Sequence, residues 1–306
     1  KAKVDFFHNT SSKNNSELAS FLRSIGIDIL IDLNGYVGKG RVEIFNSRVC
    51  KLQISWLGYN NTIGLNHSDY LIADKNLIFE KEKDLYQEKI IYLDEIWSSH
   101  SGLNIERKYN HLPSENSGYI TLGSFNNYTK ISDDTVEVWS KILKKINNSQ
   151  LILKSSVSHV DIHFKELFDK NGVLKKVIFK NRSKNFEDHI NLYKDIDLCL
   201  DTFPYTGVTT TCEALWMNVP VISLAGFNFN SRCGESILIN SNLKDLVAKN
   251  KDDYISKVVS LANDTDRLKK IRKFIFDEVL KTNTFNTKKF AANFWKSILD
   301  TYSNHK

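Results

Sequence analysis

Short apolar runs alternate with amphipathic segments along most of the chain. The first half begins with a predicted strand at Lys3–Phe7, followed by a helix that starts at Ser16 and ends at Gly26. Ile27–Leu33 is almost continuously apolar, as a strand buried on both faces requires. Shorter apolar runs predict further strands at Leu52–Trp56, Tyr70–Ile72 and Ile90–Leu93. The pattern indicates half of a parallel α/β domain.

A polar segment interrupts this pattern. Ser98–Ser117 is irregular and rich in Asn, Ser and His, which is typical of a linker. The length of 306 residues suits two domains of about 150 residues each. We therefore predict an N-terminal domain over residues 1–97, a linker over 98–118 and a C-terminal domain over 119–306.

The second half alternates regularly between strands and helices. Strands are predicted at Tyr119–Leu122, Leu151–Lys154, Val177–Phe179, Ile196–Leu200 and Val219–Leu224. The predicted helices are one capped by Ser132, then Phe186–Tyr193, Thr209–Met217, Asp253–Ala262, Asp266–Leu280 and Lys288–Tyr302. This βαβα series predicts an α/β fold with a parallel, doubly wound sheet and a ligand at the carboxyl ends of its strands.

Composition and charge exclude several classes of protein. Apolar residues make up 41% of the chain and charged residues 25%, which excludes disordered and fibrous proteins. No window approaches the roughly 18 apolar residues of a membrane span, and the first residues lack a signal-peptide core, so we expect a soluble cytoplasmic protein. The net charge of +6 is small and dispersed, so no nucleic-acid surface is expected, whereas an anionic small ligand would fit.

The sequence does not predict a metal or a cofactor. The four cysteines lie far apart without a C-x-x-C pair; they are Cys50, Cys199, Cys212 and Cys233. Asp195-Ile196-Asp197 resembles the D-x-D motif that binds a divalent metal in one class of glycosyltransferases. Because Asp197 begins a predicted strand after a short loop, we do not expect a metal there. The phosphate-binding and nucleophile motifs of kinases, dehydrogenases and α/β-hydrolases are also absent.

The strongest candidate for ligand binding is Asp201–Trp216 (DTFPYTGVTTTCEALW). A buried strand ends there in a turn with Pro204 and Gly207, and a helix starts among consecutive threonines. Backbone N–H groups at such a helix start can hold phosphate oxygens without a metal. Glu213 lies about one turn inside the helix, where a carboxylate can accept from both ribose hydroxyls. The alternative is that Thr209 is only an N-cap and Glu213 only a first-turn charge.

Two further residues follow predicted strands of the same domain. Lys130 ends the loop Gly123–Lys130 (GSFNNYTK), where it could neutralise a departing diphosphate at the same sheet edge. The alternative for Lys130 is an ordinary solvated lysine. His189 lies at the start of a helix and could contact a nucleobase edge or the backbone around it, or it could be a capping or surface histidine.

The first half carries two carboxylates that are candidates for chemistry, and two glycine-rich loops. Asp28 and Asp32 are four residues apart on a predicted strand and would face the same side. They could do acid/base work, or they could be structural partners of nearby backbone amides. Leu33–Arg41 and Trp56–Gly64 could line a cleft toward the second domain, or they could be ordinary βα turns.

These segments together resemble the catalytic region of the protein O-linked N-acetylglucosamine transferase family, including its bacterial members and the plant SPINDLY branch. The matching stretches, in order over almost the whole chain, are Asp28–Tyr36 (DILIDLNGY), Gln53–Tyr59 (QISWLGY), Ser124–Ile131 (SFNNYTKI), Leu200–Pro220 (LDTFPYTGVTTTCEALWMNVP), Ser231-Arg232 with its helix, and Phe285-Asn286-Thr287. The resemblance implies a GT-B architecture. In that architecture two Rossmann-like domains face a cleft, and the C-terminal one binds most of the sugar nucleotide without a metal.

The resemblance also implies roles for single residues. Lys130 would be the catalytic partner of the diphosphate, with Asn127 beside it. Thr209 and Thr210 would donate to phosphate, Glu213 would bind the ribose, and His189 would lie at the nucleotide. The chain departs from the family at Val208, where animal enzymes have His, at Glu213, where they have Asp, and at Asn60-Asn61, which replaces Pro-Gly.

The implied activity is inverting transfer of N-acetylglucosamine from UDP-N-acetylglucosamine to Ser or Thr hydroxyls of an acceptor protein. Transfer of fucose from GDP-fucose and a catalytically weak nucleotide-binding module are the alternatives. The family's catalytic region normally opens with a strand and a His-containing loop, which this chain lacks, so we expect an incomplete N-terminal domain belonging to a longer protein. The family also carries upstream tetratricopeptide repeats, and nothing within the 306 residues resembles one.

Overall fold

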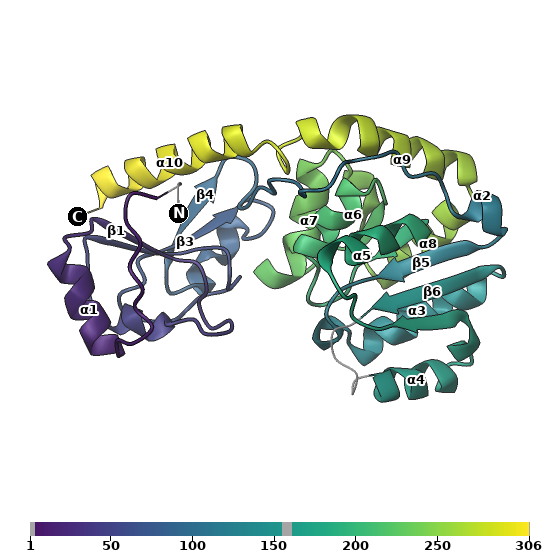
Figure 1. Ribbon diagram of the computed structural model, residues 1–306, viewed down its shortest axis with the longest axis horizontal. Helices are drawn as coiled ribbons and strands as arrows, with labels where there is room; N and C mark the ends of the chain where they lie inside the picture. The colour runs from purple at the N-terminus through teal and green to yellow at the C-terminus, as the bar shows by residue number, and fades with distance from the viewer. Residues whose placement is uncertain (1–3, 155–160, 306) are drawn as a thin grey trace. The chain divides into compact units, whose positions relative to one another are not determined.

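A computed structural model describes residues 4–154 and 161–305 of the chain (Figure 1). The chain forms two compact units, one comprising Lys1–Trp97 with Ala291–Lys306 and the other Ser98–Phe290. Within the described residues, no helix has the length and apolar character needed to cross a membrane.

The first unit is built on a four-stranded parallel sheet in the order β1-β2-β3-β4. Its strands are β1 (Ile29–Asp32), β2 (Leu52–Ser55), β3 (Tyr70–Asp74) and β4 (Lys89–Leu93), all within or next to the predicted ranges. Helix α1 (Asn15–Ser24) starts earlier than predicted, because the side chain of Asn14 accepts a hydrogen bond from the N–H of Glu17. Short 3-10 helices follow β1 and β3, at η1 (Val42–Asn46) and η2 (Glu80–Leu85).

The strand predicted at Lys3–Phe7 is wrong over its described part, because residues 4–7 form no strand. Phe6 and Phe7 are 83% and 76% exposed. Two apolar side chains that bury almost no surface gain little from pairing, so the local pattern alone does not produce a strand here.

The second unit holds a six-stranded parallel sheet in the order β10-β9-β8-β5-β6-β7. The strands are β5 (Ile120–Ser124), β6 (Ser149–Lys154), β7 (Val177–Lys180), β8 (Leu198–Leu200), β9 (Val221–Leu224) and β10 (Val247–Ala248). The helices are α2 (Ser114–Ser117), α3 (Asp133–Lys145), α4 (Asp161–Lys170), α5 (Phe186–Asn191), α6 (Thr209–Trp216), α7 (Phe229–Asn240), α8 (Lys251–Ala262) and α9 (Thr265–Glu278). Helices cover both faces of the sheet (Figure 1).

The strand order reverses between β5 and β8, which are neighbours although two strands separate them in the chain. The carboxyl ends of both strands therefore lie side by side at the middle of one sheet edge. Ligands of doubly wound sheets bind at such a reversal point. The loops that the sequence analysis singled out, around Lys130 and after Leu200, are the two that leave the sheet there.

The predicted linker belongs to the second unit, because two arginines fix its backbone. Arg272 is fully buried and donates to the carbonyl oxygens of Asn110, at 2.9 Å, and His111, at 3.3 Å. Arg107, itself in the segment, donates to the carbonyl oxygen of Trp216 at 2.8 Å. These hydrogen bonds hold the segment to the helices of the second unit.

The predicted C-terminal domain of residues 119–306 is wrong at its end, because Ala291–Lys306 belongs to the first unit. Most of this segment forms the end of helix α10 (Thr287–Asn304). Phe294 is buried with its ring centroid 4.6 Å from that of Trp56, and the Tyr302 hydroxyl donates to Asp28 at 2.9 Å. Helical periodicity shows that one face of α10 is buried, but it does not show which unit buries it.

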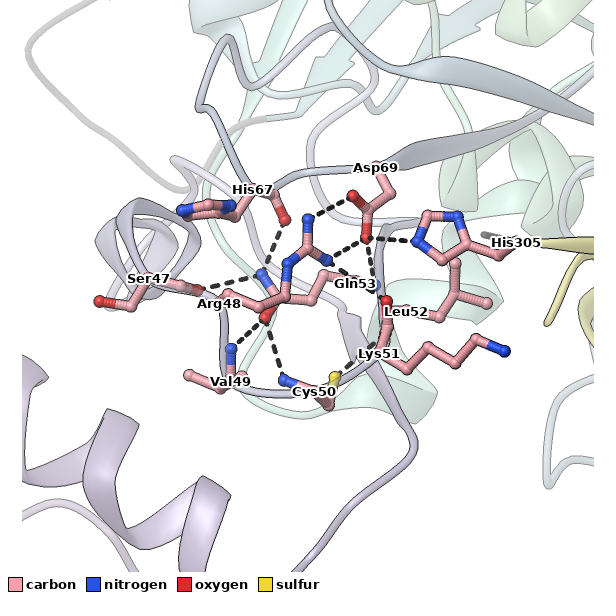
Figure 2. A network of polar contacts seen from close by, with 10 residues as sticks. All are labelled: Ser47, Arg48, Val49, Cys50, Lys51, Leu52, Gln53, His67, Asp69 and His305. Carbon is pink, nitrogen blue, oxygen red and sulfur yellow. Dashed lines mark hydrogen bonds and ion pairs between the residues drawn. The ribbon is translucent and has the colours of Figure 1, made fainter.

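A polar network fixes the approach to β2 and β3 in the first unit (Figure 2). Asp69 accepts two hydrogen bonds from the Arg48 guanidinium, at 2.5 and 2.6 Å, and one from the N–H of Gln53 at 2.8 Å. His305, beyond the end of α10, lies 4.0 Å from the same carboxylate. The Gln53 side chain donates to the carbonyl oxygen of His67 at 2.7 Å. Burial alone raises the pKa of Asp69, and the hydrogen bonds from Arg48 and Gln53 outweigh it, so the pKa lies below its usual value.

Candidate active site

Lys130 and the turn after β8 are in direct contact at the reversal point of the sheet. Lys130 ends the 3-10 helix η3 (Tyr128–Lys130), and its Nζ donates to the carbonyl oxygen of Thr206 at 2.9 Å. The same nitrogen lies 4.0 Å from the centroid of the Tyr205 ring. Burial lowers the pKa of the Lys130 ammonium, and the negative charge of Asp201 acts against this shift. The structure therefore joins the two segments that the sequence placed at one sheet edge.

Helix α6 begins beside this contact without a side-chain cap. Val208 occupies the N-cap position, so the alternative that Thr209 is the cap is wrong. Thr209 is exposed as the first helical residue, and its backbone N–H is among those that an α-helix leaves without a partner in its first turn. The Thr210 hydroxyl donates to Oδ1 of Asn126 at 2.7 Å, which ties the helix start to the loop after β5.

Glu213 is buried inside α6 and is bonded to two residues that come before it in the chain. Its Oε2 accepts a hydrogen bond from the Tyr193 hydroxyl at 3.2 Å and lies 3.1 Å from Nε2 of His189. On the other side of the imidazole, Nδ1 is in hydrogen-bond contact with the Lys154 ammonium. An ammonium group can only donate, so Nδ1 accepts and the ring hydrogen resides on Nε2, which donates to Glu213.

This arrangement bears on the expectation that His189 contacts a nucleobase edge or the backbone around it. Both ring nitrogens of His189 are engaged, by Lys154 and Glu213, and its contact with a nucleotide stays a prediction. Burial lowers the pKa of Lys154, while the charge of Glu213 raises it. The three side chains form one charged network across the carboxyl ends of β6 and β8.

A cavity of about 740 Å³ opens next to this network. Of the predicted site residues, Asn127 and His189 line it, whereas Lys130, Thr209, Thr210 and Glu213 do not. Its wall also carries cationic side chains that the sequence analysis missed, from Lys154, Arg182 and Lys184. The sequence could have located these side chains. Lys154 ends β6, the other two follow β7, and the carboxyl ends of parallel strands share one edge of the sheet.

Asp197 has structural contacts at the other end of β8. Its carboxylate accepts from the backbone N–H of Thr121 and from the hydroxyl of Ser114, both at 2.8 Å. Among the residues that the structure describes, no group of three or more His, Cys, Asp or Glu side chains is placed to hold a metal ion.

In the first unit, the two candidate carboxylates bond to neighbouring protein groups. Asp32 accepts from the backbone N–H groups of Asn34 and Gly35, at 3.2 and 2.6 Å, and so closes the turn that follows β1. Asp28 precedes β1 and accepts from the Tyr302 hydroxyl. The contacts of Asp32 match the reading as a partner of nearby backbone amides, whereas the contact of Asp28 is with a distant tyrosine side chain.

The two glycine-rich loops of the first unit pack directly on each other. A Cβ atom at Gly58 would lie 2.2 Å from the carbonyl oxygen of Leu33, so only glycine fits there. The hydroxyl of Tyr36, in the first loop, donates to the carbonyl oxygen of Ile63, in the second, at 2.9 Å. Each loop therefore depends on the other for its conformation.

Comparisons with known proteins identify the family. The sequence matches the description "Glycosyl transferase family 41" over residues 2–104 and 99–294. The chain belongs to glycosyl transferase family 41. A family 41 relative from Arabidopsis thaliana, "Probable UDP-N-acetylglucosamine--peptide N-acetylglucosaminyltransferase SPINDLY", is 32% identical over 297 residues, which cover 92% of this chain and 32% of that protein. The chain thus spans about a third of the length of its curated family 41 relatives.

Solved structures show the same fold. The O-GlcNAc transferase of Thermobaculum terrenum matches with a TM-score of 0.93 and 26% identity, over 99% of this chain and 58% of that one. The S. aureus protein TarM matches with a TM-score of 0.60 and 15% identity, over 93% of this chain and 59% of TarM, which is a likeness of fold alone. The predicted GT-B fold class and the resemblance to the O-GlcNAc transferase and SPINDLY proteins are confirmed.

Proposed function

We propose that this chain is the catalytic region of an inverting, metal-independent glycosyltransferase. It moves N-acetylglucosamine from UDP-N-acetylglucosamine to Ser or Thr hydroxyls of an acceptor protein. The observation that carries the proposal is the contact of the Lys130 ammonium with the turn that leads into the uncapped start of α6. The names of the relatives, which describe a UDP-N-acetylglucosamine peptide transferase and an O-GlcNAc transferase, support the choice of sugar and acceptor.

The leaving diphosphate binds at this contact. Lys130 uses one of its three N–H donors on Thr206, so two remain for phosphate oxygens. The first backbone N–H groups of α6 and the exposed hydroxyl of Thr209 add neutral donors at the positive end of the helix dipole. Thr210 contributes through its backbone, since its hydroxyl donates to Asn126.

The nucleoside lies toward the neighbouring cavity. Its volume of about 740 Å³ is within the range of about 300 to 1,000 Å³ typical of small-molecule sites. Glu213 accepts from the ribose hydroxyls, and Asn127 and His189 lie along the wall that the base approaches. The cationic side chains Lys154, Arg182 and Lys184 favour an anionic ligand in this cavity.

The chemistry follows from the placement of positive charge. The oxygen of the acceptor hydroxyl attacks the anomeric carbon from the face opposite the diphosphate and the hydroxyl releases its proton. The bond from that carbon to the diphosphate oxygen breaks, and the configuration inverts. Negative charge grows on the diphosphate as this bond breaks. A preorganised ammonium and backbone donors stabilise that charge more in the transition state than in the ground state.

Two measurements test the proposal. Calorimetric titration with UDP and with GDP identifies the nucleotide, and mass spectrometry of an acceptor protein incubated with each sugar donor identifies the transferred group. We expect UDP to bind and the acceptor to gain N-acetylhexosamine. Selective binding of GDP with transfer of fucose would contradict the assigned donor, and binding of neither nucleotide would contradict the proposed function as a whole.

A further inference from the structure

The carboxylate of Asp201, directly after β8, is buried and accepts four hydrogen bonds. Its Oδ1 accepts from the backbone N–H groups of Gly207 and Thr202, at 2.7 and 2.9 Å, and from Nδ2 of Asn126 at 3.2 Å. Its Oδ2 accepts from the Ser223 hydroxyl at 2.7 Å. The side chain is 1% exposed, so it does not reach a ligand itself.

These bonds connect both elements of the proposed diphosphate site. A carboxylate offers only acceptors, so it fixes the Asn126 amide with Nδ2 toward Asp201 and Oδ1 toward the Thr210 hydroxyl. On the other side, the bond to Gly207 fixes the turn whose preceding residue, Thr206, accepts from Lys130. Asp201 therefore bonds to the segment on either side of the proposed phosphate position.

Close packing prevents this arrangement from relaxing. A Cβ atom at Gly207 would lie 2.5 Å from the Thr210 hydroxyl oxygen and 2.9 Å from Oδ1 of Asn126. A Cβ atom at Gly234 would lie 2.3 Å from Oδ2 of Asp201. Both glycines are thus required for the close approach of the turn and of α7 to the carboxylate.

Three titratable groups interact electrostatically with Asp201: Lys130 of η3, Cys199 of β8 and Tyr254 of α8. From β9 and α7, Ser223 and Gly234 lie against its carboxylate, and Cys233 of α7 acts on Lys130. Burial raises the pKa of Asp201 to about 6, against the hydrogen bonds and Lys130, which lower it. In return, the carboxylate charge favours the protonated form of Lys130.

We propose that Asp201 is a positioning residue for glycosyl transfer: it orients Asn126 and the 202–207 turn, so that the diphosphate meets a preformed site. The inference rests on the proposed function, since it assigns Asp201 to the same diphosphate site. It predicts that loss of the carboxylate affects the phosphate part of the donor and not the nucleoside part.

The test is Asp201→Asn. The variant keeps the shape, because the amide oxygen can replace Oδ1 and the amide nitrogen can donate to the Ser223 hydroxyl. We expect the affinity for UDP-N-acetylglucosamine to fall at least about tenfold, as for loss of a hydrogen-bonded charge, with uridine affinity unchanged. We also expect the basic limb of the pH profile of UDP-N-acetylglucosamine binding to move to lower pH, because Lys130 then loses its proton more readily.

The matched control is Asp197→Asn, which changes another buried carboxylate at the opposite end of β8. This control tests for a general loss of order. It should leave the affinities for UDP-N-acetylglucosamine and uridine unchanged, and also the basic limb of the pH profile of binding. If Asp201→Asn does not fold, Asn126→Ala breaks the link to Thr210 and should weaken the binding of UDP-N-acetylglucosamine but not of uridine.

The inference is overturned if Asp201→Asn binds UDP-N-acetylglucosamine like the wild type, or loses both ligands equally. If Asp201→Asn does not fold, an Asn126→Ala variant that binds UDP-N-acetylglucosamine with wild-type affinity also overturns the inference. A wild-type protein that binds neither ligand would contradict the proposed function, and with it this inference.

Discussion

The Nε2 atom of His189 lies 3.1 Å from Oε2 of Glu213, and the Tyr193 hydroxyl donates to the same oxygen. Among the described residues, both of these bonds engage Oε2, which leaves Oε1 for the proposed hydrogen bonds from a ribose. The imidazole and the phenol fix the carboxylate before any nucleotide arrives. Such preorganisation reduces the entropy cost of binding.

Replacing Glu213 tests this role. Glu213→Ala should weaken nucleotide binding by about 1.5 to 3 kcal/mol, the range for hydrogen bonds to a charged group, and equally for UDP and UDP-N-acetylglucosamine. Isothermal titration calorimetry measures both affinities. Glu187→Ala, at an exposed position on α5, is the control and should bind like the wild type. A loss of stability in Glu213→Ala with unchanged affinity would show that Glu213 is only structural.

Lys130 should be needed mainly for turnover. Lys130→Ala should lower kcat by at least about two orders of magnitude, as removal of one preorganised donor to developing charge typically does. Its contact with Thr206 contributes little to folding, so thermal unfolding should change only slightly. Steady-state transfer assays with Lys144→Ala, an exposed lysine on α3, provide the comparison. Wild-type turnover in Lys130→Ala would remove Lys130 from the mechanism.

The Asp69 network should make the stability of the first unit depend on pH. Because the pKa of Asp69 is lower when folded than when unfolded, the ionised carboxylate stabilises the fold above the unfolded value of about 3.9. This contribution is lost as the pH falls through the lower pKa that Asp69 has in the folded state. Asp69→Asn should therefore be less stable at pH 7, by about 1 to 3 kcal/mol for the weakened hydrogen bonds, and the difference should shrink in acid.

Urea unfolding at pH 7 and at pH 3 measures this difference. Asp84→Asn changes an exposed carboxylate of the same unit and should have the wild-type free energy of unfolding at both values. A destabilisation by Asp69→Asn that is equally large at pH 3 would show that packing, and not charge, explains the role of Asp69.

Arg272 should be among the most important residues for the stability of the second unit. It is fully buried, and besides the linker carbonyls it donates to the carbonyl oxygens of Ile196 and Asp197, at 3.0 and 3.1 Å. Arg272→Met removes the donor that these carbonyls share, although that of Asn110 keeps a hydrogen bond from the Asn218 amide, so we expect a loss of about 3 to 5 kcal/mol in the free energy of unfolding. Denaturant titration should show no comparable loss for Arg267→Met, at an exposed position of α9.

The parts of the site that follow from chain topology could be predicted. Apolar runs located the central strands, and the rule that parallel strands end at one edge brought Lys130 to the turn before Thr209. The same rule applied to Lys154 would have found the cationic wall of the cavity. It was missed because a lysine at the end of a strand has no feature that separates it from a solvated one.

Other parts depend on contacts that no local pattern encodes. The tautomer of His189 is set by Lys154 and Glu213, which come from different strands and helices. The importance of Asp201 depends on its donors from the loop after β5, from β9 and from the turn that follows it. Such long-range polar contacts depend on the packed fold, so periodicity and capping signals cannot reveal them.

The assignment of Ala291–Lys306 to the first unit has a consequence for synthesis of the chain. Every strand of the second unit is made before these residues, so the ribosome completes that sheet while the first unit still lacks the helix carrying Phe294 and Tyr302. Phe294, which packs on Trp56, is synthesised almost 240 residues after it (56 to 294), and Tyr302, which bonds to Asp28, is synthesised 274 residues after it. In the order of synthesis, the unit that is begun first is thus the one whose last packing residues are made last.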